Sequence, residues 1–316
     1  MWNADQTVAV VNPNAAGGRV GKQWEDLERE LRIRLGSVQF VLTERAGHAI
    51  ELARSAVESG ATTILSMGGD GTHNEVVNGI MLAGPAPGTI NLGLLPAGTG
   101  GDFRRMCNHN ADALTAAAAL PGAEGLPIDV GSLSFCADNG SETDRYFINI
   151  ASFGIGGLVD RFANQSKKRL GGKATFYIAT VKALMTYKPA TVRLRIDDRD
   201  MGEHTITNIL VCNGRYCGGG MKFAPDAKLG DGLFDVIILR HKSILSTIAM
   251  TGSIYTGKHI ENPTVDVHQG ARVTAETITD AAAYLDIDGE APGVLPANFR
   301  IHHHAVNLLD VRPEVV

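Results

Sequence analysis

The chain has 316 residues, enough for two domains, and its 44% hydrophobic and 20% charged residues are typical of an ordinary soluble globular protein. A net charge of −5 argues against nucleic-acid binding, which would require a basic surplus. The four cysteines form no C-x-x-C pair, so they predict reduced thiols in a cytoplasmic protein rather than a disulfide framework. We expect no signal peptide and no membrane-spanning segment, because the sequence shows no leader and no long apolar stretch.

Strands and helices alternate through the first third of the chain. The predicted strands are residues 8–11, 40–43, 64–67 and 90–96, and the predicted helices are residues 21–35, 49–58 and 74–81. This alternation predicts a parallel sheet flanked by helices. Ligands of such sheets bind beyond the carboxyl ends of the strands, so we expect the loops at Asn12, Thr43, Gly68 and Ala97 to converge.

The third of these loops, Gly68-Gly69-Asp70-Gly71-Thr72, follows an apolar strand and precedes a helical pattern. Its glycines allow positive φ and close approach of a ligand to the backbone, and Thr72 is placed to cap the helix. The helix N-terminus then forms an anion cradle that favours phosphate. Asp70 is compatible with phosphate if a divalent cation lies between them. The alternative is a plain strand–turn–helix corner.

A second glycine-rich loop covers residues 96–105 and again carries an acid, Asp102. Two carboxylates, Asp70 and Asp102, would repel one another in one cleft unless a bound cation pairs with them. The alternative for Asp102 is a helix N-cap before Phe103.

From about residue 132 the pattern changes to strands of alternating character, as in residues 191–196, where Arg193 and Arg195 alternate with apolar residues. We therefore expect a mostly β second domain, interrupted by helices near 155–164 and 174–187. The basic cluster Lys167-Lys168-Arg169 lies between these helices. It is either solvated surface or a contact with anionic lipid headgroups.

Two further segments are rich in possible metal ligands. Asp226, Asp231 and Asp235 lie close together in a loop and could hold a hard cation, although their spacing alone favours a plain loop. Strand alternation should send the neighbouring rings of His302-His303-His304 to opposite faces, which argues against a three-histidine metal site.

The last feature is the segment 284–293. In a strand Asp286 and Asp288 share one face, and Asp288-Gly289 predicts a turn that directs Glu290 away from the strand end. A carboxylate on a rigid hairpin is a candidate general base. The alternative is an exposed hairpin with solvated acids.

The two glycine-rich motifs, the loop from Pro225 to Leu233 and Asp288-Gly289-Glu290 occur in this order, and together they resemble the diacylglycerol kinase catalytic-domain family, most closely its soluble bacterial lipid-kinase branch, which is related to the sphingosine kinases. The first motif alone is shared with NAD kinases. The resemblance covers nearly the whole chain. Gly101 departs from the pattern, because many relatives have Asn before the Asp-Phe pair.

The resemblance implies an α/β plus β fold. Residues 1–132 would form a Rossmann-like, parallel-sheet ATP-binding domain and residues 133–298 a mainly antiparallel β-sandwich lipid-substrate domain, with ATP in the cleft between them. Residues 299–316 would pack back on the first domain. The implied activity is transfer of the γ-phosphoryl group of Mg-ATP to the hydroxyl of a lipid such as diacylglycerol, in a cytoplasmic protein that meets membranes transiently.

The resemblance also implies roles for particular residues, and those assigned to ATP are Asn12, Pro13, Asn14, Ala15, Ala16, Thr43, Gly68, Gly69, Asp70, Gly71, Thr72, His73, Asn74 and Thr99. Asp70 would hold a catalytic Mg²⁺ with support from Asp102, and Glu290 would be the general base. A structural Mg²⁺ would be held by Asp231 and the carbonyl oxygens of Lys228 and Leu233.

Two other functions remain open. An NAD kinase-like phosphotransferase would not explain Asp288-Gly289-Glu290 or the second glycine loop, and a non-catalytic nucleotide- or lipid-binding regulator would not need Asp70, Asp102 and Glu290. Diacylglycerol, phosphatidylglycerol, a sphingoid base and an isoprenoid alcohol fit equally well as acceptors. A homodimer is compatible with the sequence.

Overall fold

The computed structural model describes residues 2–98, 101–137, 140–165 and 172–316. The chain divides into two compact units. The first contains Met1–Val130, Lys228–Gly232 and His302–Val316, and the second contains Gly131–Ala227 and Leu233–Ile301. The sequence did not indicate that the short segment Lys228–Gly232 belongs with the first unit.

The first unit is an alternation of strands and helices. Its elements are the 3-10 helix η1 (Ala4–Gln6), β1 (Thr7–Val11), α1 (Ala15–Lys22), α2 (Trp24–Leu35), β2 (Gln39–Leu42), α3 (His48–Glu58), β3 (Thr63–Gly68), α4 (Asp70–Leu82), β4 (Asn91–Pro96), η2 (Phe103–Met106), α5 (Ala113–Ala119), η3 (Leu120–Gly122) and η5 (Pro313–Val315).

The strands of this unit run in the order β4–β3–β1–β2 and pair in parallel. The end of β16 (Gly293–Leu309) adds a further parallel partner, because Asn307 and Leu308 pair with Asn91 and Leu92 of β4. Strand β3 is buried along its whole length. A strand covered on both faces explains why its sequence is a continuous apolar run rather than an alternation.

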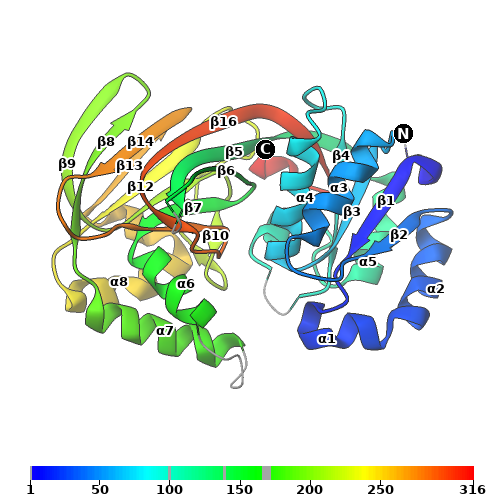
Figure 1. The fold of residues 1–316 in the computed structure, drawn as a ribbon, viewed down its shortest axis with the longest axis horizontal. Coiled ribbons are helices and arrows are strands. Elements are labelled where there is room, and N and C mark those ends of the chain that lie inside the picture. Colours follow the sequence, from blue (N-terminus) through cyan, green and yellow to red (C-terminus); the bar gives the residue numbers. More distant parts are fainter. Residues whose placement is uncertain (1, 99–100, 138–139, 166–171) are drawn as a thin grey trace. The chain divides into compact units, whose positions relative to one another are not determined.

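Helices cover both faces of the parallel strands, with α3 and α4 together on one side and α2 and α5 on the other (Figure 1). Leu31 and Leu35 of α2 are buried in a core that also contains Leu65 and Met67 of β3. On the other side, α3 and α4 approach closely at Gly79, where a Cβ atom would lie 2.4 Å from the carbonyl oxygen of Ile50.

The second unit is rich in strands. Its elements are β5 (Gly125–Ala137), which begins in the first unit, β6 (Glu142–Phe147), β7 (Ile150–Gly154), α6 (Ile155–Gln165), α7 (Gly172–Thr186), β8 (Ala190–Ile196), β9 (Arg199–Cys212), β10 (Tyr216–Cys217), β11 (Met221–Lys222), β12 (Phe234–Arg240), α8 (Ile244–Thr256), η4 (Lys258–Glu261), β13 (Val265–Gly270), β14 (Arg272–Thr277) and β15 (Tyr284–Ile287), followed by the first part of β16.

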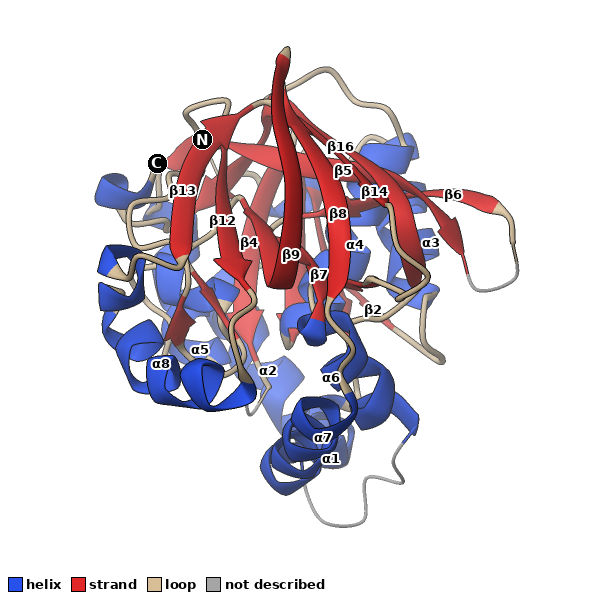
Figure 2. Cartoon of the chain, turned by 90° about the vertical axis from the view of Figure 1, so that its left-hand side faces the viewer, coloured by secondary structure: helices blue, strands red, loops and turns tan. Residues whose placement is uncertain are grey.

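Pairing within the second unit is antiparallel, in the order β13–β12–β9–β7–β15. The long strand β9 also pairs with β8, which continues to β14 and β16 (Figure 2). The two rows share a core in which Phe147 stacks on Phe234 and Phe153 on Phe299, with ring centroids 5.6 and 5.9 Å apart. The prediction of a β-rich second part is therefore confirmed.

Two local expectations were wrong. The predicted helix at residues 21–35 is divided at Gln23 into α1 and α2, and residues 16–18 at the start of α1 have positive φ, so the right-handed helix begins only afterwards. Helix α8 was not predicted, although Ser243 caps its N-terminus by accepting a hydrogen bond from the Ser246 N–H. Among the residues that the structure describes, no helix has both the length and the apolar character needed to span a membrane.

Candidate active site

The first unit contains a cavity of about 470 Å³ at the carboxyl ends of its parallel strands. The loops that follow β1, β2, β3 and β4 all contribute to it, so the four loops meet. The lining residues are Asn12, Asn14, Ala15, Ala16, Thr43, Arg45, Ala46, Ala49, Gly69, Asp70, Gly71, Thr72, Glu75, Gly98 and Gly101.

The first glycine turn places the N-terminus of α4 in the wall of this cavity. The first backbone N–H groups of a helix have no acceptor within the helix, and Asp70, Gly71 and Thr72 form that first turn. Thr72 is not the cap that the sequence suggested. The N-cap position is Gly69, and Thr72 Oγ1 instead accepts a hydrogen bond of 2.9 Å from Asn12 Nδ2.

Gly68, Gly69 and Gly71 do not have positive φ, and close packing requires a glycine at Gly68, whereas nothing lies within 4 Å of an added Cβ atom at Gly71. A Cβ atom at Gly68 would lie 2.4 Å from Thr72 Oγ1, and a Cβ at Gly98 would lie 3.0 Å from the Cα atom of Gly69. The two glycine-rich loops therefore touch through their backbones. Gly101 has φ of +118°, a region that strongly favours glycine, and it also lines the cavity.

Asp70 connects the two loops. Its Oδ2 accepts the backbone N–H of Asp102 at 2.9 Å, and its Oδ1 accepts that of Phe103 at 3.2 Å. Each carboxylate oxygen can accept a second interaction, so Asp70 retains the donor capacity that a hard cation needs. The Asp102 carboxylate is largely buried and pairs with Arg105 Nε at 3.4 Å.

Several predicted nucleotide-binding residues do not line the cavity. The His73 ring is buried and bonds Ser66 Oγ at 2.7 Å, and burial lowers its pKa to about 4, so the side chain is neutral and faces the sheet. Pro13, Gly68 and Asn74 are also absent from the lining. Thr99 lies outside the described residues.

Six lining residues are not among the predicted nucleotide-binding residues: Gly98 and Gly101 of the second glycine-rich loop, and Arg45, Ala46, Ala49 and Glu75. The Glu75 carboxylate accepts the backbone N–H groups of Gly47 and Ala49 at 3.0 and 3.2 Å, so it satisfies the start of α3 from the neighbouring helix. Arg45 adds a cation that also pairs with Glu51 at 2.6 Å. The sequence signal for the contacts of Glu75 with Gly47 and Ala49 was its position near the start of a predicted helix.

Of the predicted structural metal loop, residues 228–232 belong to the first unit and are held by it, whereas Leu233 belongs to the second unit. The Leu229 N–H donates to the carbonyl oxygen of Val315 at 2.7 Å, and the Gly232 N–H donates to Asp129 Oδ2 at 2.7 Å. Asp231 is exposed beside these anchors. A carboxylate and carbonyl oxygens are the donor set that Mg²⁺ prefers, so the residues present fit such an ion.

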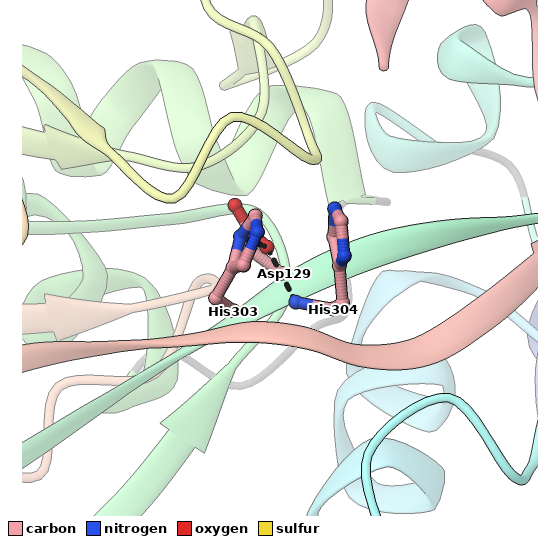
Figure 3. A group of neighbouring side chains, drawn as sticks. All are labelled: Asp129, His303 and His304. Carbon is pink, nitrogen blue, oxygen red and sulfur yellow. Dashed lines mark hydrogen bonds and ion pairs between the residues drawn. The ribbon is translucent and has the colours of Figure 1, made fainter.

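Asp129, His303 and His304 form a cluster that the sequence reasoning missed (Figure 3). The buried Asp129 carboxylate accepts the His304 backbone N–H at 2.7 Å and bonds His303 Nδ1 at 2.9 Å. The expectation that neighbouring rings point to opposite faces was wrong here. His304 has φ of +51°, which breaks the strand alternation, and the two rings stack with centroids 3.6 Å apart.

The geometry of this cluster suits the anchoring of neighbouring backbone better than the binding of a metal ion. Nitrogen lone pairs lie in the plane of each ring, and because the two rings are stacked 3.6 Å apart and inclined by only 27°, these lone pairs run side by side rather than toward one ion. His304 Nε2 also bonds the carbonyl oxygen of Gly230 at 3.1 Å. Asp129 and His304 therefore fix the loop that carries Asp231.

The predicted general base belongs to the second unit. Residues 287–290 form a tight turn in which Ile287 and Glu290 exchange backbone hydrogen bonds of 2.8 and 3.0 Å, with positive φ at Asp288 and Gly289. The Asp288 carboxylate accepts the N–H groups of Ile148 and Ile150 at 3.1 and 2.9 Å. Glu290 is exposed at the end of this turn.

The basic cluster at 167–169 lies outside the described residues.

Comparison with known proteins places this two-unit architecture among kinases. Residues 6–133 match the diacylglycerol kinase catalytic domain, and residues 149–310 match the YegS C-terminal NAD kinase beta sandwich-like domain. A diacylglycerol kinase of Staphylococcus epidermidis is 33% identical over 261 residues, covering 81% of this chain and 77% of the relative. One of Bacillus subtilis is 31% identical over 258 residues, covering 81% and 80%. The chain therefore belongs to the diacylglycerol kinase family of lipid kinases.

Solved structures agree with this fold. A putative diacylglycerol kinase from Bacillus anthracis superposes with a TM-score of 0.78 at 23% identity, covering 98% of this chain and 96% of that one. Yeast NADH kinase, solved with NADH, reaches a TM-score of 0.51 at 10% identity, covering 98% and 84%.

Proposed function

We propose that this chain transfers the γ-phosphoryl group of Mg-ATP to the hydroxyl group of a lipid such as diacylglycerol. The observation that carries this proposal is the cavity of the first unit, where the N-terminus of α4, the Asp70 carboxylate and two touching glycine loops meet. Family membership supports the reaction class, and the chemistry of the cavity supports a polyphosphate ligand.

The first unit would bind and orient the nucleotide as a Rossmann-like domain does, beyond the carboxyl ends of its strands. The N–H groups at the start of α4 would donate to the phosphate oxygens, and the glycine backbones would let these oxygens approach closely. Asn12, Asn14 and Thr43 provide polar groups in the cavity wall. Such pre-positioned donors stabilise the charge that develops during phosphoryl transfer.

Mg²⁺ would supply neutralisation of phosphate charge near Asp70, whose two oxygens each keep a lone pair beyond their bonds to backbone N–H groups. Asp102 would support Asp70, because its own N–H donates to that carboxylate. A second Mg²⁺ would be held by Asp231 and the carbonyl oxygens of Lys228 and Leu233, on the loop that Asp129 anchors.

Glu290 would act as the general base of the reaction. It would take the proton from the attacking lipid hydroxyl, and the oxygen would then attack the γ-phosphorus in line with the leaving oxygen. Its exposure at the end of a turn with reciprocal backbone bonds suits a base that must reach an external substrate.

The decisive test is transfer of label from γ-labelled ATP in the presence of Mg²⁺. The acceptors are diacylglycerol, phosphatidylglycerol, a sphingoid base and an isoprenoid alcohol in mixed micelles, with NAD⁺ in a parallel reaction. Label in one lipid class supports the proposal and identifies the acceptor. Label in NAD⁺ alone would establish the NAD kinase-like alternative, and bound ATP without any transfer would favour a regulator.

We further propose that the chain meets its acceptor at a membrane surface through α7. Ile178, Val181 and Met185 are exposed on one face of this helix, at spacings of three and four residues, and border a surface hollow of about 390 Å³. Lys182 lies beside them, with its ammonium 4.0 Å from the Phe162 ring centroid. An apolar stripe with an adjacent cation suits the boundary between acyl chains and anionic headgroups.

A further inference from the structure

Helix α6 lies directly on strands β7 and β15 because two consecutive glycines occur in its first turn. A Cβ atom at Gly157 would lie 2.3 Å from the carbonyl oxygen of Tyr284 and 2.5 Å from that of Leu285. A Cβ atom at Gly156 would lie 2.8 Å from Ser152 Oγ. The helix therefore approaches the strands to backbone distance, which brings the side chains of its next turn against β15.

Asp160 stands in that next turn, and its carboxyl group forms a hydrogen bond with the carboxyl group of Asp286 on β15. Ionised carboxylates only accept hydrogen bonds, so this contact requires a proton on one of the two groups. Burial raises the pKa of Asp160 to about 6. Burial, together with the neighbouring Asp160 carboxylate, raises the pKa of Asp286 well above its usual value.

Asp286 also holds the turn that carries Glu290. Its Oδ1 accepts the backbone N–H of Gly289 at 2.9 Å, and its Oδ2 accepts the hydroxyl of Ser152 on β7 at 3.1 Å. Gly289 immediately precedes Glu290. One carboxyl group thus joins α6, β7 and the turn, and none of these three contacts is a backbone ladder bond.

We propose that Asp160 and Asp286 form a proton-sharing carboxyl pair that positions the Glu290 turn by tying it to helix α6. Both are positioning residues, because they act through Gly289 and not on the reacting atoms. The inference rests on the proposed role of Glu290 as base. A base that is misplaced by even about 1 Å loses much of its rate advantage, so such support has a kinetic consequence.

The pair gives this support a pH dependence. The ionisable groups on the packed elements are Arg161 of α6, whose guanidinium lies 5.1 Å from the Tyr284 ring centroid, and Asp288 and Glu290 of the turn. Strand β7 contributes the hydroxyl of Ser152. When the pH rises above the raised pKa values of the pair and the shared proton leaves, the two adjacent negative charges repel each other and the contact between α6 and the turn is lost.

The test compares Asp160→Ala with Asp160→Asn in the full chain. An asparagine amide can donate to the Asp286 carboxylate without a shared proton, whereas alanine removes the contact. Asp198→Ala is the matched control, because the Asp198 side chain is 96% exposed in the same unit. Amide hydrogen exchange of residues 287–291 reports the turn directly, and lipid kinase kcat is measured from about pH 6 to about pH 9.

We expect Asp160→Ala to speed exchange in the turn and to lower kcat by about 10- to 100-fold, while ATP affinity is unchanged. Asp160→Asn should restore both and should keep its rate to higher pH than the unmodified protein, because the amide has no proton to lose. Thermal melts of both variants report on folding. Asp198→Ala should match the unmodified protein.

Unchanged exchange in Asp160→Ala would overturn the proposal, as would an Asp160→Asn variant with the same alkaline decline as the unmodified protein. The exchange measurement does not depend on activity. If no lipid is phosphorylated but Asp160→Ala still loosens residues 287–291, the pair positions the turn and only the proposed function fails.

Discussion

The carboxylate of Asp70 accepts the backbone N–H of Asp102 at 2.9 Å, so a side chain of the first glycine turn organises the backbone of the second. The repulsion expected between the two carboxylates is avoided because each has a different partner. Asp70 meets the amide of Asp102, while the Asp102 carboxylate pairs with Arg105. The group proposed to hold Mg²⁺ is therefore also a structural link between the loops that shape the cavity.

This double role makes Asp70→Asn informative. The amide oxygen can accept only one of the two N–H groups comfortably, since the amide nitrogen would face a donor, and the charge that binds a cation is lost. We expect stability to fall by about 1–3 kcal/mol and kcat by about 10²- to 10³-fold. Nucleotide titration with and without Mg²⁺ should show that the metal no longer strengthens binding.

The control for Asp70→Asn is Asp26→Asn on α2, where the side chain is 83% exposed. It should leave both titrations unchanged. An Asp70→Asn protein with the normal effect of Mg²⁺ on ATP affinity would contradict the assignment.

Gly98→Ala tests the contact between the two glycine loops. The new Cβ atom would lie 3.0 Å from Gly69 Cα, and because that neighbour is backbone, the loops must separate. Overpacking of this kind costs about 1–3 kcal/mol, and we expect ATP affinity to fall by about tenfold. Gly122→Ala is the control, because no atom lies within 4 Å of its added Cβ. Equal calorimetric affinities in the two variants would show that the contact is unimportant.

The sequence could predict the strand–helix alternation and the meeting of four loops because both follow from local periodicity and from the geometry of parallel sheets. It could not predict what each glycine does. Gly69 and Gly98 are 29 residues apart, and only the tertiary fold shows that their backbones touch. Threonine is a favoured N-cap residue, so the sequence suggested this role for Thr72. In the structure the Thr72 hydroxyl oxygen instead accepts a hydrogen bond from Asn12 of a distant loop.

The same limit applies to single dihedral angles. One positive φ at His304 reverses the face on which its ring lies, and no residue pattern marks a histidine for that conformation. The turn at Asp288-Gly289 was predictable, because both residues tolerate positive φ. The partner of Asp286 was not, since Asp160 is far away in the sequence and comes close only through the approach of α6.

Buried His73 should make the first unit less stable in mild acid. Burial lowers the pKa of His73 to about 4 from 6.5, so the unfolded state binds a proton at higher pH than the folded state. The stability contribution is complete above about pH 6.5 and is lost as the pH falls toward about 4. Between about pH 7 and about pH 5 the unfolding free energy should drop by about 2 kcal/mol from this group.

Urea unfolding monitored by tryptophan fluorescence measures this effect, because both tryptophans, Trp2 and Trp24, belong to the first unit. His73→Gln removes the titrating ring. The variant should show a smaller loss of stability between the two pH values. An identical loss in both proteins would mean that other groups account for it.

Met185→Gln tests the proposed membrane contact of α7. Met185 is 79% exposed, so its replacement should not affect folding, but burial of such a side chain in lipid contributes about 1.5–3 kcal/mol. We expect affinity for anionic vesicles to fall by about tenfold or more. Ile33→Gln on α2, where the side chain is 72% exposed in the first unit, is the control. Equal sedimentation of both variants with vesicles would exclude this face of α7.

Glu290→Gln separates proton transfer from nucleotide binding. The amide has nearly the shape of the carboxylate and cannot accept a proton, and Glu290 is exposed, so the fold should be unaffected. Loss of a general base lowers kcat by about 10²- to 10⁴-fold, while ATP affinity measured by titration should stay the same. Glu276→Gln, an exposed position on β14 of the same unit, should retain full turnover. Because the two variants differ only in which carboxylate is removed, normal turnover in Glu290→Gln would assign the base to another residue.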